Sequence, residues 1–395
     1  MTSLLILVIV ALLGIAVWQL TKIFDLTQSK QHVGEDYKTQ IATDKDNNIN
    51  GYLMFGFLGF IYIFTIYSCV KWGYMPLLSN SASEHGTDVD TLMWISLVVI
   101  FIVQIVTQFL LHYFAFIYRG NKDRKATFYA DNEKLEFIWT IIPVIVLAGL
   151  ILYGLYAWNN IMHYDEEEDV MYVEVYAKQF NWDFRYAGDD NVLGKANVRF
   201  IEGINVVGAD MADPNAQDDI ITKELRLPVG KKVVLKMRSQ DVLHSAYFPH
   251  FRAQMNTVPG MVTQFAMTPT VTTTEMRDRE EIVDRVNKIN EARNKQSKKL
   301  VEKGEPGLEP YTFDYILLCN KICGRSHYNM QAKVVVETEA QFRKWIAQQP
   351  KLGKQVAEEK AAATAPKVEA QPVQTPVQEP QIVVDTTAVV AQVIK

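Results

Sequence analysis

The run FIWTIIPVIVLAGLILYGLYAW, residues 137–158, is followed closely by VMYVEVYA, residues 170–177. The first run contains no charged side chain and is long enough for a helix that crosses a bilayer, which needs about 20 apolar residues. The second run alternates, with Val173, Val175 and Ala177 on one face, as expected of a half-buried strand. This change of period predicts a membrane anchor followed by a β domain in water.

Three more apolar runs come earlier in the chain, at Leu4–Leu20, Tyr52–Val70 and Leu92–Ile117. Four such runs in one part of a chain favour membrane spans over buried core helices. No basic residue precedes the first run, so we interpret it as a retained helix rather than a cleaved signal peptide. We expect two extra membrane helices with their loops over residues 1–90, and a helical hairpin over residues 91–158.

Lysine and arginine are unevenly distributed over the loops between these runs. The loops 21–50 and 119–136 are rich in them, whereas the loop 71–91 carries Lys71 alone. Because cytoplasmic loops of membrane proteins carry the excess of Lys and Arg, the first two loops are predicted to face the cytoplasm. Four spans then place both termini and the β domain on the opposite side of the membrane.

Short alternating runs continue through the second half of the chain. Examples are Glu224–Met237 and Ala332–Glu337, which are rich in Val and Leu and bounded by Pro, Gly or Asp. Short strands with such turn residues between them predict an antiparallel sandwich or barrel, here over residues 159–350, and we expect a Greek-key sandwich.

Two segments depart from the strand pattern. Residues 275–305 are dense in charge with apolar residues at helical spacing, and Thr272 and Glu275 form a candidate capping box before them. We expect an amphipathic helix or hairpin inserted between two strands, either solvated on the sandwich or serving as a docking surface. Residues 351–395 are largely Ala, Pro, Gln and Val, which predicts a disordered tail.

Charge and cysteine content exclude several classes of protein. The formal net charge of −5 argues against a nucleic-acid binder, and three cysteines are too few for a disulfide scaffold of this size. Residues 159–220 carry 14 acidic against 4 basic residues, so this stretch is either a solvated face or a surface that steers a basic partner. No Cys-x-x-Cys-His motif is present, so no c-type haem is attached to the chain.

The segment CNKICGRSHYNM, residues 319–330, combines two cysteines, a histidine and a methionine at close spacing. Thiolate, imidazole and thioether together suit a copper site for electron transfer, whereas structural zinc prefers Cys and His. A disulfide between Cys319 and Cys323 is a competing interpretation, but it leaves His327 and Met330 unexplained. Two thiolates can bridge two copper ions, which requires a second histidine from elsewhere.

Two histidines remain as candidates for that second imidazole. His244 and His250 follow a predicted strand, whereas the others lie in or beside the apolar runs or on the far side of the membrane. A turn at a strand end can meet the cysteine segment at one pole of a sandwich.

At this point the chain resembles subunit II of the haem–copper cytochrome c oxidases over roughly residues 90–350. LEFIWTIIP, residues 135–143, resembles the entry to that family's second helix, and SQDVLHS, residues 239–245, resembles its upstream copper-ligand motif. Residues 319–330 resemble its binuclear copper loop, called CuA. The resemblance favours His244 over His250 and implies a cupredoxin-like fold for the β domain.

The resemblance also implies a set of ligands to the two copper ions. Cys319 and Cys323 would bridge both ions as thiolates, while His244 and His327 would each bind one. Met330 would be a weak axial ligand, and the backbone carbonyl of Lys321 would be the axial ligand on the other ion.

Lys321 stands where the family usually has a glutamate between the two cysteines. That glutamate reaches a magnesium or manganese ion at the boundary with subunit I, and an ammonium group cannot ligate such an ion. The magnesium site is therefore doubtful in this chain.

Three further residues are candidates for a role in the family's reaction. Phe180 occupies the expected position of the electron-entry tryptophan, and Trp182, two residues later, would share its face in a strand. Packing of aromatic side chains under a loop is the alternative for both. Glu136 matches a glutamate that resembles the family's proton-uptake entrance, although a carboxylate there also suits the helix dipole.

The resemblance implies an electron-entry subunit of a respiratory terminal oxidase in the bacterial inner membrane, with its copper domain in the periplasm. It would pass electrons from cytochrome c, or from a cytochrome-bearing complex, to haem in subunit I, where oxygen is reduced and protons are pumped. Expected partners are oxidase subunits I and III, the cytochrome donor and membrane lipid. The alternatives are a copper-free quinol-oxidase subunit II, which would lack the ligands, and a copper chaperone or thiol-redox protein, which would not need the anchor.

Overall fold

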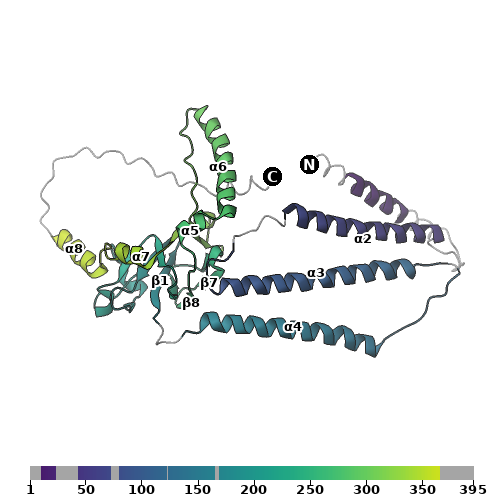
Figure 1. Cartoon of the computed structure of the whole chain (residues 1–395), viewed down its shortest axis with the longest axis horizontal. Helices are drawn as coiled ribbons and strands as arrows, with labels where there is room; N and C mark the ends of the chain where they lie inside the picture. Colours follow the sequence, from purple (N-terminus) through teal and green to yellow (C-terminus); the bar gives the residue numbers. More distant parts are fainter. Residues whose placement is uncertain (1–9, 24–42, 73–79, 122, 165–168, 365–395) are drawn as a thin grey trace. The chain divides into compact units, whose positions relative to one another are not determined.

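The computed structural model describes residues 10–23, 43–72, 80–121, 123–164 and 169–364 (Figure 1). These residues belong to two units. One comprises α2 (Asp44–Trp72) and the larger part of α3 (Gly86–Ile117). The other comprises the start of α3, nearly all of α4 (Glu133–Met162) and the β domain.

Three described helices are long and apolar enough to cross a membrane. They are α2, α3 and α4, so the second, third and fourth predicted spans are confirmed as helices. Each is longer than its apolar run because polar residues at its ends continue the helix. The first predicted run is described only as a shorter helix over Val10–Ile23, and residues 4–9 lie outside the described residues.

The extra helix α2 packs against α3 in the first unit. The Tyr62 hydroxyl donates to the Ile105 carbonyl at 2.6 Å, and the rings of Phe55 and Phe116 meet edge to face at 4.9 Å. These contacts pair the additional helix with α3.

Ten strands form two five-stranded sheets in the second unit. The first has the order β3 (Ile220–Thr222), β2 (Asn181–Tyr186), β1 (Met171–Lys178), β5 (Val233–Ser239), β8 (Thr263–Met267). The second has the order β4 (Leu225–Pro228), β10 (Gln331–Glu337), β9 (Tyr315–Cys319), β6 (His244–Phe248), β7 (Ala253–Thr257). Inward side chains of both sheets, such as Val175 and Leu317, share one apolar core, which confirms the sandwich.

The expectation of a purely antiparallel sandwich is wrong, because each sheet contains one parallel pair. β1 pairs with β5 in parallel, and β4 pairs with β10 in parallel. The chain crosses to the other sheet between the members of each pair, so the returning strand runs in the same direction as its neighbour.

The predicted insertion is confirmed as two helices, α5 (Thr273–Arg277) and α6 (Glu280–Val301). Thr272 and Glu275 form the expected capping box. Ile282 anchors α6 in the sandwich core, and the rest of the helix extends away from the strands (Figure 1). The returning chain braces it, since Arg293 donates to the Glu309 carbonyl at 2.8 Å.

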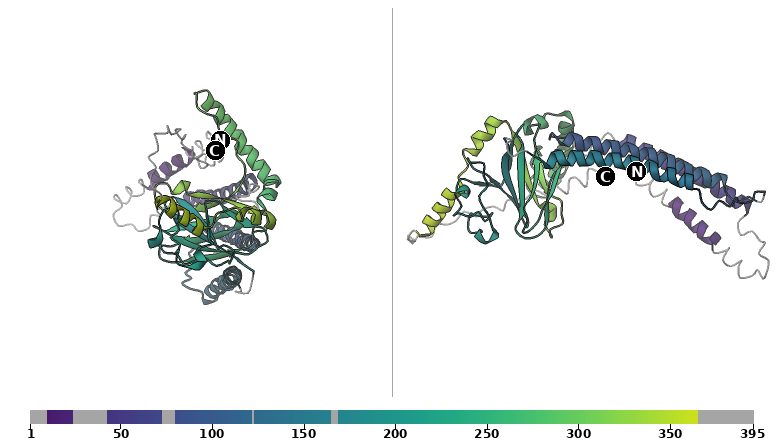
Figure 2. Two further views of the ribbon diagram at one scale, coloured as in Figure 1. Left: turned by 90° about the vertical axis from the view of Figure 1, so that its left-hand side faces the viewer. Right: turned by 90° about the horizontal axis from the view of Figure 1, so that it is seen from below.

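The prediction of a disordered tail from residue 351 is wrong for its first part. After α7 (Glu339–Ile346), residues Leu352–Thr364 form α8, the yellow helix beside the sandwich (Figure 2). Leu352 is fully buried, and its backbone amide donates to the Asp219 carbonyl at 2.7 Å. One buried leucine and Val356 one turn later suffice to dock a helix whose composition is otherwise that of a tail. Residues 365–395 lie outside the described residues.

His250, the second candidate histidine, is buried in an aromatic cluster. Its ring lies 5.2 Å from that of Phe313 and 5.5 Å from that of Tyr315. Burial, together with the nearby cations Arg252 and Arg285, lowers the pKa of His250 to about 4. This histidine is therefore neutral in the folded protein at pH 7.

We expect His250→Phe to make the protein more resistant to acid. The unfolded chain binds a proton near pH 6.5, whereas the folded chain resists it down to about pH 4. The contribution of His250 to the free energy of unfolding is therefore fully present above pH 6.5. It is lost as the pH falls, and the loss reaches about 3 kcal/mol at pH 4. The variant lacks this loss, so its Tm in detergent should fall less between pH 7 and pH 4.5. An equally steep fall in parent and variant would contradict this account.

Candidate metal centre

Two strand ends place the main predicted ligands beside each other. His244 is the first residue of β6 and Cys319 is the last residue of β9, and these strands are antiparallel neighbours. The loop after Cys319 returns as β10, and the Cys319 amide donates to the Met330 carbonyl at 3.0 Å. The loop is thus closed at its base by strand pairing, which holds its sulfur and nitrogen atoms in place.

All six predicted ligands gather in this loop and strand end. The two cysteine sulfurs are 3.9 Å apart, and Cys319 Sγ lies 3.7 Å from His244 Nδ1 and 3.3 Å from the Lys321 carbonyl oxygen. Cys323 Sγ lies 3.6 Å from His327 Nδ1 and 3.8 Å from Met330 Sδ. Two donors on one tetrahedral ion, with bonds of about 2.0–2.3 Å, are about 3.3–3.8 Å apart. These separations are therefore of the size that shared metal ions require.

The geometry argues against a disulfide and against one tetrahedral zinc ion, and it is compatible with a copper site of the CuA type. A disulfide requires sulfurs about 2.05 Å apart, and both cysteines are free. Five side-chain donors and a carbonyl exceed the four positions of one tetrahedral zinc ion. Two ions that share both thiolates would each have four donors: two sulfurs, one imidazole, and either a thioether or a carbonyl.

Asp241 orients His244, a role that sequence reasoning missed. Its Oδ1 lies 2.9 Å from His244 Nε2, and because a carboxylate only accepts, that ring nitrogen must carry the hydrogen. Nδ1 is then left with a lone pair facing Cys319. A carboxylate behind the imidazole is the usual support of a metal-binding histidine, so an acidic residue near a candidate ligand was the available signal.

The two thiols do not ionise equally. Burial raises the pKa of Cys319, but hydrogen bonds with His244 and with the Lys321 and Ser245 backbone outweigh this and lower it to about 6. Burial and the neighbouring Cys319 thiolate raise the pKa of Cys323 to about 12. The pair thus loses one proton readily and retains the second, because two thiolates this close repel each other. A site that is to hold both as thiolates needs positive charge between them.

Gln179, in the turn between β1 and β2, braces both halves of the centre. Its side-chain amide donates to the Cys323 carbonyl, and its backbone amide donates to Asp241 Oδ2 at 2.7 Å. Sequence reasoning missed this residue, because a glutamine carries no signal of metal binding.

The expectation that Phe180 and Trp182 share a strand face is wrong. Phe180 lies in the turn, where a Cβ on Gly324 would come within 2.9 Å of its ring, while β2 begins only at Asn181. Gly324 has φ +141°, so a glycine there both avoids strain and leaves room for Phe180. Trp182 is fully buried, with its ring 6.2 Å from that of His244 and edge to face.

The remaining candidates belong to other elements of the chain. Glu136 is in the first turn of α4, where the helix dipole favours a carboxylate. In the acidic stretch 159–220, Glu174, Asp183 and Asp219 are buried in ion pairs with Lys or Arg, so they contribute little to a steering surface.

Comparison with known proteins identifies two domains. The profile of the cytochrome c oxidase subunit II transmembrane domain matches residues 69–157, and that of its periplasmic domain matches residues 171–282. The second match ends where α6 begins, so the cysteine loop lies beyond the inserted helix and beyond the matched span.

Curated relatives agree with these matches. The alternative cytochrome c oxidase subunit 2 of Bradyrhizobium diazoefficiens is 31% identical over 280 residues, which cover 70% of this chain and 84% of the relative. The cytochrome c oxidase subunit 2 of Cereibacter sphaeroides is 22% identical, over 70% of this chain and 79% of the relative. A probable quinol oxidase subunit 2 of Staphylococcus saprophyticus is 25% identical, over 43% of this chain and 39% of the relative.

The anchor, the cupredoxin-like sandwich and the compatible His–Cys–Cys group agree with these matches. The chain therefore belongs to the cytochrome c oxidase subunit II family and is a membrane-bound component of a haem–copper oxidase, an oxidoreductase complex.

Proposed function

We propose that this chain is the electron-entry subunit of its oxidase and holds a binuclear CuA copper centre. It accepts electrons from cytochrome c, or from a docked cytochrome-bearing complex, and passes them to haem in subunit I. Oxygen is reduced to water on that partner, with proton pumping. The observation that carries this proposal is the convergence of two thiols, two imidazoles, a thioether and a carbonyl within hydrogen-bonding or contact distance.

The same observation argues against the copper-free alternative. A quinol-oxidase type of subunit II has no need of these donors, and a relative with that name is among the similar proteins. Here His244, Cys319, Cys323, His327 and Met330 are all present and adjacent. Metal binding explains why these five donors lie together and why Asp241 and Gln179 hold them in place; packing alone does not.

The residues around the centre keep its geometry fixed. His244 and Met330 are almost completely buried and Cys323 is 6% exposed, so water has little access to these three donors, whereas His327 is half-buried. A bound copper pair would supply one-electron transfer with little rearrangement. The strand ends, Asp241 and Gln179 hold the donors in one arrangement, which lowers the reorganisation that accompanies a change of charge.

The proposal also assigns candidates for electron entry and for proton uptake. Phe180, which is partly exposed, and Trp182, which contacts His244, are the candidates for electron entry. Glu136 is the candidate for proton uptake. Lys321 presents an ammonium group instead of a carboxylate, so we propose no magnesium site at this residue.

The proposed setting is the bacterial inner membrane, which the chain crosses several times, with its copper domain on the periplasmic side. The proposed partners are oxidase subunits I and III, the cytochrome donor and lipid. The helices before α3 and the α6 insertion add surface beyond the matched domains.

Metal analysis of the purified oxidase tests the proposal. We expect two copper ions for each copy of this chain beyond those of the partner subunits, no zinc in the β domain, and a visible band from thiolate-to-copper charge transfer. A reductive titration should place one electron in the pair. One zinc ion, or no metal on this chain, would exclude the proposed role.

A further inference from the structure

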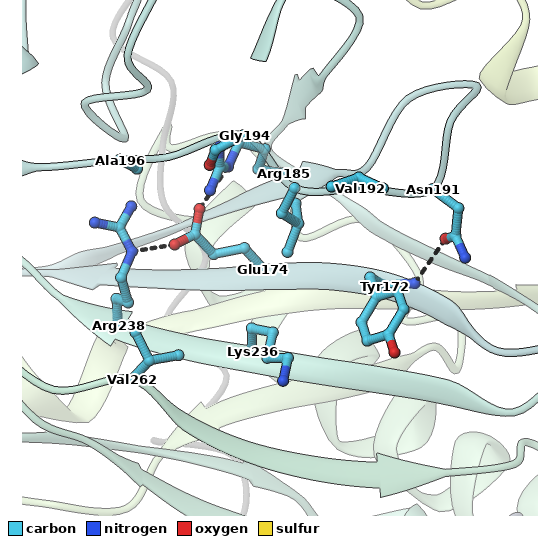
Figure 3. A pocket seen from close by; sticks show the side chains of 11 residues that line it. Tyr172, Glu174, Arg185, Asn191, Val192, Gly194, Ala196, Lys236, Arg238 and Val262 are labelled. Atoms are coloured by element: carbon cyan, nitrogen blue, oxygen red, sulfur yellow. Dashed lines mark hydrogen bonds and ion pairs between the residues drawn. The ribbon is translucent and has the colours of Figure 1, made fainter. Parts of the chain in front are cut away.

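A cavity of about 390 Å³ lies on the outer face of the first sheet (Figure 3). Because Val173 and Val175 point into the core, the alternate residues Tyr172 and Glu174 point outward and line the cavity. The loop 191–196 forms another wall, and Val262 a further one. None of the six proposed copper ligands lines it.

Cross-strand pairing brings charged side chains together under this loop. Glu174 is opposite Arg185 in β2 and opposite Lys236 in β5. Its carboxylate is 1% exposed and accepts from Arg185 Nε at 2.6 Å and from Arg238 Nε. Arg185 also donates to Asp219 at 2.8 Å. The three cations Arg185, Arg238 and Lys236 thus lie near only two carboxylates, those of Glu174 and Asp219.

The unmatched positive charge belongs to Lys236. Its ammonium group donates to the neutral Gln264 side chain and lies 5.7 Å from the centre of the Tyr172 ring. In the described part of the chain no carboxylate is within ion-pairing distance of it. An ammonium at the wall of a cavity, with only neutral partners, favours an anion in that cavity.

Two guanidinium nitrogens add hydrogen-bond donors. In the described residues, no acceptor is bound by Nη2 of Arg185 or by Nη1 of Arg238, although both side chains line the cavity and are largely buried. Neither nitrogen is among the solvent-excluded unpaired atoms of the described residues, so both are free to donate to water or to a ligand in the cavity. The two acidic residues just before the loop 191–196 do not supply an acceptor for these nitrogens. Asp189 pairs with Lys351, and Asp190 accepts from the Val192 amide.

We propose that this cavity binds a small organic anion. A carboxylate or phosphate group would lie against Arg185, Arg238 and Lys236, where charge-assisted hydrogen bonds are strongest. An apolar body would lie against Val262 and the Tyr172 ring. The cavity volume is in the range of small-ligand sites.

Calorimetric titration of the full-length chain in detergent tests this site with benzoate, inorganic phosphate and the neutral analogue benzamide. We expect saturable binding of benzoate or phosphate and none of benzamide at the same concentration. Lys236→Gln should weaken anion binding about tenfold or more, because it removes a charge-assisted contact. Lys298→Gln, an exposed lysine on α6, is the matched control and should change nothing.

A second variant tests the site without touching the buried charges. Val262 is 59% exposed, so Val262→Glu leaves the core intact and places a carboxylate at the cavity wall. Anion binding should weaken, whereas Val301→Glu at the similarly exposed end of α6 should not affect it. Benzamide binding as tight as benzoate, no saturable binding of either anion, or equal affinity in Lys236→Gln and its control would overturn the proposal. Copper content should be unchanged in all four variants.

Discussion

Replacing Cys323 by serine should eliminate the proposed binuclear copper centre. Cys323 Sγ lies 3.9 Å from Cys319 Sγ, 3.6 Å from His327 Nδ1 and 3.8 Å from Met330 Sδ. A serine hydroxyl stays protonated at neutral pH and cannot replace a bridging thiolate, which copper prefers. Elemental analysis of the purified oxidase should show the loss of copper from this chain, together with the loss of the charge-transfer band.

Lys321→Ala is the matched control within the same loop. Only the backbone carbonyl of Lys321 faces the centre, 3.3 Å from Cys319 Sγ, and alanine retains that carbonyl. This variant should keep both copper ions and the parent spectrum. A Cys323→Ser chain that retained two copper ions, or a Lys321→Ala chain that lost them, would contradict the assignment of donors.

Replacing Glu174 by glutamine should destabilise the β domain by about 3–5 kcal/mol. The carboxylate is 1% exposed and joins Arg185 to Arg238. Glutamine keeps the shape but removes the negative charge, so Arg185 keeps only Asp219 as a carboxylate partner and Arg238 keeps none among the described residues. The free energy of unfolding, measured by denaturant titration of the full-length chain in detergent, should show the loss.

Glu224→Gln provides the comparison for a solvated ion pair. Glu224 and Arg226 have side chains 29% and 26% exposed and are 3.0 Å apart. Water screens such a pair, so its loss should cost only about 0–1 kcal/mol. Equal effects of the two substitutions would mean that the buried network contributes no more than surface charge.

Local patterns were sufficient to locate most elements. The three long apolar runs predicted α2, α3 and α4, and the alternation of Val173, Val175 and Ala177 predicted β1. Neighbouring residues also form the capping box before α5. Strand direction was not predictable in this way, because the parallel partner of β1 is more than fifty residues away, in β5.

The helix α8 shows another limit of composition. Residues 352–364 contain few large apolar side chains, which is typical of a tail. The helix is nevertheless docked, because Leu352 enters a pocket formed by Tyr176, Val207 and Ala216. Whether such a pocket exists depends on the loop before β3 and not on the helix itself.

By itself, the sequence determined the anchor, the strands and the spacing of four donors between residues 319 and 330, since these depend only on composition, period and short-range order. Tertiary structure alone decided that His244 lies beside Cys319 while His250 lies among aromatic rings, because the pairing of β6 with β9 joins segments 75 residues apart. It also decided that Asp241 and Gln179 brace the donors, and that Lys236 lines a cavity and has no carboxylate of the described residues within ion-pairing distance. Hydrogen bonds and ion pairs form between atoms brought together by strand register, which no local pattern specifies.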